Sequence, residues 1–176
     1  DIDEYRVVKS HSLMDNIKIR QIQKKDDSQL FKLVRQSLKE AHLDIPGTAY
    51  FDESIKEMSS FYLNHKKRDY FVLVDQNDEV LGGIGYAEFN DSDKIAELQK
   101  LYLFKKAQGK GLSYKLISLV EKEAKKAGYD SLYLETHSNL VAAIYIYKKL
   151  GYALLKNPLP GSEHSTMDHF FIKELI

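Results

Sequence analysis

The feature that most constrains the fold is a change of hydrophobic period near the middle of the chain. Two apolar, β-prone runs at residues 70–75 and 79–89 are joined by Gln76-Asn77-Asp78, which predicts a β-hairpin. Strand and helix periods then alternate, as a strand at 97–104, a helix at 109–127, a strand at 131–136 and a helix at 139–150. This order predicts an α/β fold, with a mixed sheet that carries helices on both faces.

The remaining regular segments extend this sheet toward both ends of the chain. We expect a strand at 17–22, a helix from Asp26 or Asp27 to Ala41, a loop at 43–52, a weaker helix from Ile55 to Tyr62, and strands at 152–156 and 165–175. The first 16 residues show no strand or helix period, so we interpret 1–16 as an N-terminal extension, native or left over from cloning. Residues 17–176 then form a single domain, which suits a chain of 176 residues.

The composition excludes several classes of protein. The chain has 26 Lys and Arg against 26 Asp and Glu, and this zero net charge lacks the basic footprint of a nucleic-acid-binding protein. No apolar run approaches the roughly 20 residues of a membrane helix, and the charged N-terminus has no signal-peptide core. Cysteine is absent, which excludes disulfides, thiolate metal sites and a cysteine acyl-enzyme. We therefore expect a cytoplasmic protein without nucleic-acid or membrane partners, and a homodimer is compatible with the sequence.

Two histidines near the C-terminus are the remaining candidates for metal ligands. His164 and His169 lie five residues apart, close to Asp168. A metal centre would need a third ligand and a geometry that the sequence does not indicate. We therefore expect no metal.

A glycine-containing turn joins the strand at 97–104 to the helix that follows it. Gly109 and Gly111 let the backbone approach a ligand closely, and the unpaired amides and dipole of the helix start favour an anion. The turn does not match a Walker loop, because Phe104 stands at the first glycine position, nor a dinucleotide loop, because Tyr114 stands at the third. Phosphate binding and an ordinary turn at the start of a helix therefore both remain open.

A second glycine run, Gly82-Gly83-Ile84-Gly85, lies inside a strand and leads to no helix. Glycine within a strand marks a bulge or a close approach of backbone. We therefore interpret this run as structural rather than as a phosphate loop.

Two segments together resemble a known family. Gln108-x-x-Gly111-x-Ser113, after Leu101-Tyr102-Leu103, resembles the acetyl-coenzyme-A (acetyl-CoA) loop of the GNAT-type N-acetyltransferases, Gln/Arg-x-x-Gly-x-Gly/Ala. Downstream, the segment AIYIYKKLGY at 143–152 resembles that family's Ala-Ile-x-Leu-Tyr-x-Lys-x-Gly-Phe. The resemblance extends from Ile17 to about Ile176. Ser113 departs from the loop pattern but is still small.

The resemblance implies a sheet that splays between the strands at 97–104 and 131–136, with the pantetheine arm of acetyl-CoA in the gap. Leu101 and Leu103 would contact that arm through backbone groups, as an added strand would, and the amides of 108–113 would hold the pyrophosphate. The implied cofactor-binding residues are Leu101, Tyr102, Leu103, Gln108, Gly109, Lys110, Gly111, Leu112, Ser113, Asn139, Ala143 and Tyr147. Asn139 lies one residue before the position where the family often has Asn, and capping the following helix is its alternative role.

The resemblance also implies the chemistry of acetyl transfer to an amine. Tyr147 would protonate the departing thiolate, since a phenol remains protonated at neutral pH; its alternative role is a core aromatic. A backbone N–H near Leu103 would stabilise the oxyanion. Glu97 is the first candidate for the base and Glu135 the second. A non-catalytic acyl-CoA sensor on the same fold is the alternative function.

The acceptor would be a primary amine of a small molecule or peptide, entering opposite the cofactor. Two loops are expected to cover that side, at 43–52 and 157–165. Tyr50 and Phe51 in the first loop are the candidate acceptor contacts. A hydrophobic lid over the core is their alternative role.

Overall fold

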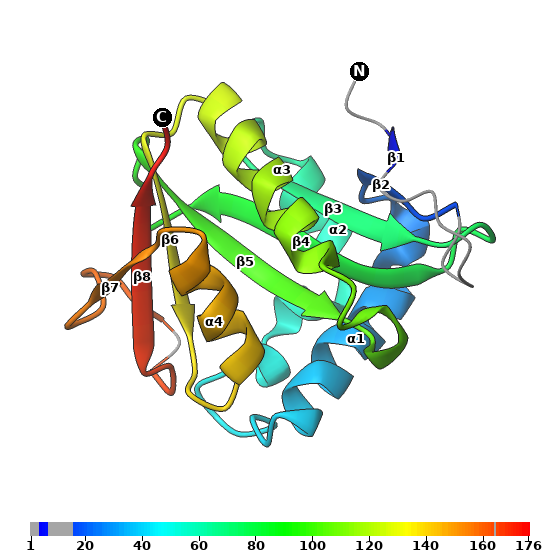
Figure 1. Ribbon diagram of the computed structural model, residues 1–176, viewed down its shortest axis with the longest axis horizontal. Helices are drawn as coiled ribbons and strands as arrows, with labels where there is room; N and C mark the ends of the chain where they lie inside the picture. Colours follow the sequence, from blue (N-terminus) through cyan, green and yellow to red (C-terminus); the bar gives the residue numbers. More distant parts are fainter. Residues whose placement is uncertain (1–3, 7–15, 164) are drawn as a thin grey trace.

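The computed structural model describes residues 4–6, 16–163 and 165–176. Within these residues, eight strands form one mixed sheet in the order β1-β2-β3-β4-β5-β6-β8-β7 (Figure 1). The strands are β1 Glu4–Arg6, β2 Lys18–Gln21, β3 Asp69–Val74, β4 Val80–Glu88, β5 Ile95–Leu103, β6 Ser131–Thr136, β7 Ala153–Leu155 and β8 His169–Glu174. Neighbouring strands are antiparallel except β5 and β6, which are parallel. The predicted mixed α/β sheet is confirmed.

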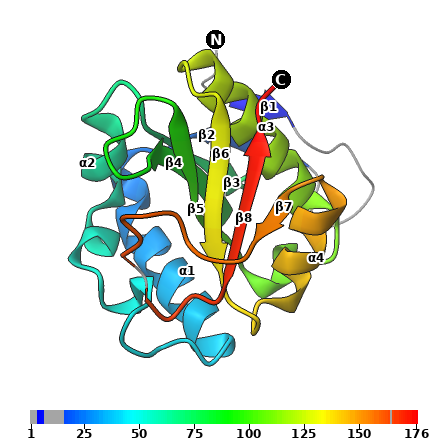
Figure 2. The same ribbon diagram turned by 90° about the vertical axis from the view of Figure 1, so that its left-hand side faces the viewer.

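Helices cover both faces of this sheet, as predicted. Helices α1, Asp27–Glu40, and α2, Met58–Leu63, lie on one face, and α3, Leu112–Lys126, and α4, Val141–Lys149, lie on the other (Figure 2). In α1 the apolar residues recur every three to four positions, which places them on one stripe against the sheet: Leu30, Leu33, Val34 and Leu38, all buried. The sheet therefore separates two hydrophobic cores, one under each pair of helices.

Several element boundaries differ from the predicted ones, each for a local reason. The predicted helix at 109–127 begins only at Leu112, because Gly111 has a φ of +74°, which a helix cannot include. The helix predicted at 139–150 begins at Val141. The weak helix predicted from Ile55 is a 3-10 turn, Glu53–Lys56, separated from α2 by Glu57 in a non-helical conformation.

Part of the expected N-terminal extension joins the sheet. Strand β1 pairs antiparallel with β2, Tyr5 opposite Ile19. Three residues are too few to show a period in the sequence, so pattern analysis missed this strand. The rest of the expected extension, 1–3 and 7–15, lies outside the described residues, and the domain boundary at residue 17 stays a prediction.

The sheet opens between β5 and β6, where the splay was predicted. These strands pair only over Ile95–Glu97 against Ser131–Tyr133. Beyond Glu97, β5 continues beside β4 while β6 continues beside β8, so the two strands separate. The register of β5 against β4 shifts opposite Gly83 to Gly85, and Lys100 at this bulge has a φ of +51°. A bulge bends its strand, so it accompanies the divergence of β5 from β6.

The glycine run in β4 leaves room for the Tyr70 ring, which contacts this bulge. The Tyr70 hydroxyl donates to the Lys100 carbonyl oxygen at 2.9 Å. A Cβ at Gly83 would lie 2.5 Å from the Tyr70 ring, and one at Gly85 would also lie 2.5 Å from it. Both positions therefore exclude a side chain, which confirms the predicted close backbone approach.

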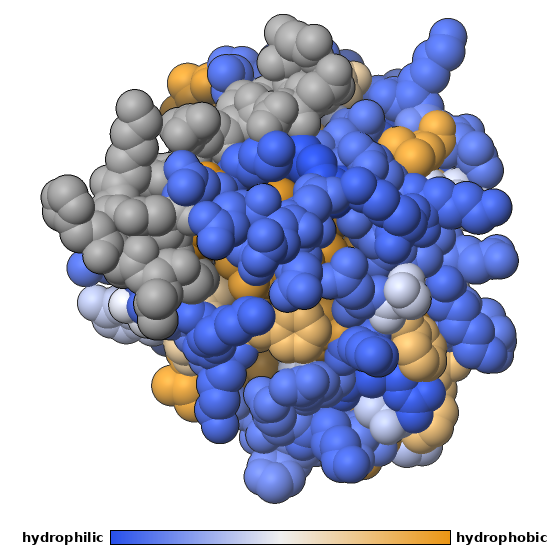
Figure 3. All heavy atoms as spheres, turned by 90° about the vertical axis from the view of Figure 1, so that its right-hand side faces the viewer, coloured by the Kyte–Doolittle hydropathy of each residue, from blue (hydrophilic) through white to orange (hydrophobic). Residues whose placement is uncertain are grey.

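The side of the molecule that lies to the right in Figure 1 is mainly hydrophilic, with hydrophobic side chains showing in small areas between polar ones (Figure 3). In the part of the chain that the structure describes, no helix combines the length and apolar character required to cross a membrane. The large hydrophobic side chains that are exposed are dispersed over the chain, for example Ile45, Leu63 and Leu154.

Candidate active site

A cavity of about 490 Å³, here called the β5–α4 cavity, opens where β5 leaves β6. Eight of the predicted cofactor-binding residues line it: Leu101, Tyr102, Leu103, Gln108, Gly109, Ser113, Asn139 and Ala143. Lys110 and Gly111 are exposed in the same loop, whereas the Leu112 side chain is buried in the core. The structure thus brings residues from β5, the following loop and α4 together around one space.

The loop at this cavity has the backbone of an anion site. Gly109 and Gly111 have φ values of +75° and +74°, and a Cβ at either position would meet nothing within 4 Å. Gly111 is the N-cap of α3, and no side chain caps this helix. The first N–H groups of α3 therefore lack a capping acceptor beside open space, where the helix dipole favours a negative charge.

The edge of β5 supplies backbone groups to the same cavity. Hydrogen bonds alternate between the two sides of an antiparallel strand, and the Phe104 N–H donates to the Leu81 carbonyl of β4 at 2.8 Å. The Leu103 N–H therefore faces away from β4, toward the gap. The Gln108 amide donates to the Leu103 carbonyl at 3.0 Å and ties the loop to this edge.

Asn139 does not cap the helix that follows it, so that alternative role is wrong. The N-cap of α4 is Leu140, without a capping side-chain hydrogen bond. The Asn139 amide instead donates to the Ala41 carbonyl at 2.9 Å. This bond ties the start of α4 to the end of α1, and both Asn139 and Ala41 line the β5–α4 cavity.

Tyr147 is a core aromatic, one of the two roles considered for it. It does not line the β5–α4 cavity, and its role as an acid stays a prediction. Its side chain is only 4% exposed, and its ring packs against Tyr152 and Phe171 with centroids 5.7 and 5.8 Å apart. Among the described residues its hydroxyl has no hydrogen-bond partner, yet it is not one of the fully enclosed polar atoms. Burial raises the pKa of Tyr147, and Tyr102, which lines the β5–α4 cavity, raises it further.

Both predicted carboxylates line the next two cavities along the splay. A central cavity of about 90 Å³ and an acidic cavity of about 290 Å³ share Glu97, Gln99, Lys100 and Glu135. Glu97 is the last residue of β5 paired with β6, and Glu135 lies on β6 just beyond that pairing. The structure therefore places the two carboxylates on opposite sides of the opening.

Hydrogen bonds orient both carboxylates. The buried Tyr62 hydroxyl donates to Gln99 Oε1 at 2.7 Å, and Gln99 Nε2 donates to Glu97 Oε1 at 2.8 Å. The Tyr133 hydroxyl donates to Glu135 Oε2 at 2.7 Å. Sequence analysis missed Gln99, although its spacing of two from Glu97 on a strand places both side chains on one face.

The three cavities adjoin one another through the sheet. The central cavity shares Tyr102 and Leu140 with the β5–α4 cavity, and it shares Glu97 and Glu135 with the acidic cavity. We refer to this row of three neighbouring cavities, from the glycine loop and α4 to the carboxylates on the α1/α2 side, as the passage.

The loop predicted at 43–52 contacts the segment just after the other predicted loop, 157–165. The Thr166 hydroxyl donates to the Pro46 carbonyl at 2.7 Å. Ala49 lines the central cavity and Asp52 lines the acidic cavity. Tyr50 and Phe51 lie between them but line none of these cavities, and their acceptor role stays a prediction.

The two aromatics have surroundings of their own. The Arg35 guanidinium of α1 lies 4.0 Å from the centre of the Tyr50 ring. Phe51 is 60% exposed and packs edge-on against Tyr50 with centroids 5.0 Å apart. These ring contacts hold the 43–52 loop against α1, and the two rings do not point into the passage.

His169, near the C-terminus, belongs to a different arrangement. His169 Nδ1 lies 2.8 Å from Asp168, whose carboxylate also accepts hydrogen bonds from Ser138. Burial acts to raise the pKa of Asp168, but the hydrogen bonds from His169 and Ser138 outweigh it and lower that pKa. His164 lies outside the described residues. Among those that are described, no three His, Asp or Glu side chains gather as a metal site.

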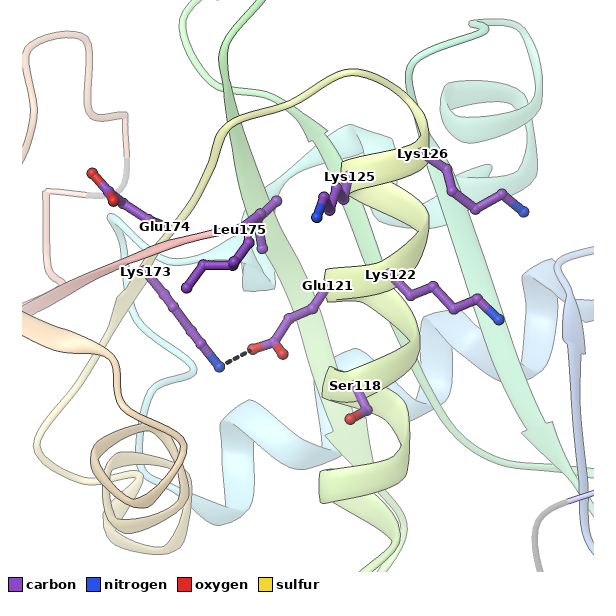
Figure 4. Close-up of a pocket in the computed structure, with 9 residues that line it drawn as sticks. Ser118, Glu121, Lys122, Lys125, Lys126, Lys173, Glu174 and Leu175 are labelled. Carbon is purple, nitrogen blue, oxygen red and sulfur yellow. Dashed lines mark hydrogen bonds and ion pairs between the residues drawn. The ribbon is translucent and has the colours of Figure 1, made fainter.

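A larger hollow of about 720 Å³ lies apart from this passage, between α3 and the end of β8 (Figure 4). Lys173 from β8 reaches Glu121 of α3 at 3.1 Å across it. The Tyr152 hydroxyl donates to the same carboxylate at 2.7 Å. Because this hollow contains none of the predicted site residues, size alone does not identify the functional cavity.

The structure thus combines a splayed sheet, an uncapped helix start beside the gap and oriented carboxylates at the other end of it. Comparison with known proteins identifies the family: residues 30–152 match the Acetyltransferase (GNAT) family. The chain therefore belongs to this family and is an acyltransferase, as the resemblance implied.

Individual relatives agree over most of the chain. Uncharacterized N-acetyltransferase YjgM of Escherichia coli (strain K12) is 30% identical over 159 residues, covering 89% of this chain and 94% of the relative. The crystal structure of a GNAT-family acetyltransferase from Staphylococcus aureus Mu50 superposes with a TM-score of 0.80 at 20% identity, covering 91% of this chain and 99% of that one. The yncA structure from Salmonella typhimurium, with its cofactor acetyl-CoA, has a TM-score of 0.71 at 20% identity, covering 91% and 94%.

Proposed function

We propose that this protein transfers the acetyl group of acetyl-CoA to a primary amine of a small molecule or peptide by direct attack. The observation that carries this proposal is the passage through the splayed sheet. Its β5–α4 end is lined by eight of the twelve residues implied for acetyl-CoA, and its other end is lined by Glu97 and Glu135. The yncA structure, which has the same fold, contains acetyl-CoA as its cofactor.

The β5–α4 cavity offers a separate group for each part of acetyl-CoA. The amides from Gly109 to Ser113 and the neighbouring Lys110 would hold the pyrophosphate. The β5 edge at Leu101 and Leu103 would hydrogen-bond the pantetheine amides as a neighbouring strand does. Asn139 and Ala143 form the facing wall on the α4 side.

The reaction joins the two ends of the passage. The amine nitrogen attacks the thioester carbonyl carbon, the C–N bond forms, and the C–S bond breaks. The proton lost by the amine goes to the base, and the departing sulfur accepts a proton from Tyr147. The Leu103 N–H, which faces the gap, would stabilise the oxyanion, a contribution worth roughly 3 kcal/mol where it has been measured.

Tyr147 would be a weak acid in this step. Burial raises its pKa, so its hydroxyl stays protonated at neutral pH. An ordinary thiol has a pKa of about 8.5. For each unit by which the pKa of the phenol exceeds that of the thiol, complete proton transfer costs about 1.4 kcal/mol. Its contribution therefore begins as hydrogen-bond donation to the developing thiolate and ends with the proton on sulfur.

Glu97 is the better placed of the two candidate bases. Its carboxylate is fixed by Gln99, which the buried Tyr62 holds in turn. It also lies on β5, the strand that borders the β5–α4 cavity. Glu135 lies across the opening and is oriented by Tyr133, which suits a second role in binding the amine.

Release of free thiol from acetyl-CoA, measured against a panel of amines with mass-spectrometric detection of product, tests this function. We expect thiol release that requires an amine and an acetylated amine in equal amount. Calorimetric binding of acetyl-CoA without turnover of any amine would instead support the acyl-CoA sensor.

A further inference from the structure

The acidic cavity has an excess of negative charge at the acceptor end of the passage. Its described lining includes six carboxylates and two cationic side chains, which gives a formal charge of minus four. The carboxylates belong to Asp52, Glu88, Asp91, Glu97, Glu135 and Glu163, and the cations to Arg68 and Lys100. This cavity is assigned to the site by its position and not by its charge, because it shares four lining residues with the central cavity.

The two cations are already engaged by carboxylates of the same lining. Arg68 pairs with Glu88 through two hydrogen bonds, at 2.7 and 2.8 Å. Lys100 lies on the floor, shared with the central cavity, where burial lowers its pKa and the nearby Asp52 and Glu97 act to raise it. Most of the excess negative charge is therefore carried by Glu135 on the wall and by Asp91 and Glu163.

Asp91 and Glu163 form an exposed rim that packing between two loops brings together. Asn90, next to Asp91, donates to the Pro160 carbonyl at 3.3 Å. Gly161 has a φ of +96°, and a Cβ there would lie 2.4 Å from the Asn90 side chain. This close contact fixes the loop before β8 against the β4–β5 turn, so both carboxylates belong to one cavity.

Resting on the proposed function, we infer that the acceptor is a linear amine with a second positive charge, such as a diamine or polyamine. The reacting amine would lie at the floor, where Glu97 accepts its proton. The second ammonium would lie at the rim, near Asp91 and Glu163. A cleft lined by one sign of charge concentrates ligands of the opposite sign, whereas an acceptor carboxylate would meet like charge.

Putrescine and butylamine test the second charge directly, because they match in chain length. We expect kcat/KM for putrescine to exceed that for butylamine by about tenfold or more at low ionic strength, the lower bound for such focusing. This advantage should shrink toward 1 M salt, where the Debye length falls to about 3 Å. Aspartate, an amine with two carboxylates, should be the poorest acceptor of the three.

A pair of double variants tests whether Asp91 and Glu163 bind the second ammonium group. Asp91→Asn/Glu163→Gln should raise KM for putrescine about fivefold, consistent with losing two exposed charge pairs, and leave butylamine kinetics unchanged. Asp44→Asn/Glu57→Gln removes the same charge from exposed positions outside the cavities and should change neither. Circular dichroism melting of both variants would show that the fold is retained.

The outcomes separate this inference from the proposed function. Equal kcat/KM for putrescine and butylamine, or a preference for aspartate, would overturn the inference and leave acetyl transfer standing. An Asp91→Asn/Glu163→Gln effect that is equal for both amines would also overturn it. Absence of turnover with every amine would overturn the proposed function as well.

Discussion

The two ends of the passage are built from different parts of the polypeptide. The β5–α4 cavity is lined by backbone and by small or aliphatic side chains, such as Gly109, Ser113 and Ala143. The acidic cavity is lined by charged side chains, such as Glu135 and Glu163. A site made of backbone is a property of the fold, so it suits a constant co-substrate. A site made of side chains can change by substitution, so it suits the variable acceptor.

The two ends also differ in how they are held. The first lies on β5, α3 and α4, which are anchored in the core that contains Leu112 and Leu116. The second depends on loop contacts, such as Thr166 on Pro46 and Asn90 on Pro160. Substitutions at the first end should therefore act on all substrates alike, and substitutions at the second should act on particular acceptors.

The largest expected effect is at the backbone-made end. Gly111→Glu introduces a side chain at a φ of +74°, which costs roughly 1–2 kcal/mol for an ordinary residue. It also places a negative charge where the pyrophosphate would bind. We expect calorimetry to detect no acetyl-CoA binding by this variant.

Gly151→Glu is its matched control. Gly151 ends α4 with a φ of +89°, and a Cβ there also meets nothing within 4 Å. This variant carries the same backbone strain and the same charge away from the passage, so it should bind acetyl-CoA normally. Unchanged affinity in Gly111→Glu would show that the cofactor does not use this loop.

The same division explains what the sequence could predict. Gln108 to Ser113 and the segment at 143–152 are each continuous in the sequence, so their patterns could be recognised, and the structure brings residues of both to the β5–α4 cavity. The acidic cavity joins Asp52, Asp91 and Glu163, which lie far apart in the chain, and only their packing brings them together. The left-handed φ of Lys100 was equally hidden, because lysine rarely adopts it.

The next largest effect concerns Tyr147, which belongs to the core on the α4 side of the sheet rather than to the lining of either end. Tyr147→Phe should lower kcat by about 10²–10⁴-fold, the usual range for a general acid, with acetyl-CoA affinity nearly unchanged. Because burial raises the pKa of Tyr147 above its ordinary value of about 10, its ionisation should cause no loss of activity below that pH. Rate measurements across alkaline pH would check this.

Tyr152→Phe controls for loss of a hydroxyl in the same aromatic cluster. It removes the hydrogen bond to Glu121 and should cost stability while leaving kcat nearly intact. A loss of less than about threefold in Tyr147→Phe, with chemistry rate-limiting, would assign Tyr147 to packing alone.

The two carboxylates at the opening should separate in their kinetics. Glu97→Gln should lower kcat by about 10²-fold, the lower range for a general base, and should remove the acidic limb of the pH–rate profile. Glu135→Gln should act mainly on the KM of the acceptor. If Glu135→Gln instead removes the acidic limb, the roles of the two carboxylates are exchanged.

The smallest expected effect tests whether the acceptor end extends to the aromatic loop. Tyr50→Ala removes the stacking with Arg35 and Phe51, worth about 0.5–1 kcal/mol for an exposed cation–π contact and about 0.5–1.5 kcal/mol for an aromatic pair. For a domain of this size each 1 kcal/mol shifts Tm by about 2–4 °C, so we expect Tm to fall by a few degrees. Because the ring lines none of the cavities, the KM for putrescine should change by less than about twofold. A several-fold rise in that KM at unchanged Tm would instead show that Tyr50 contacts the acceptor. The acceptor end of the passage would then extend beyond the acidic cavity.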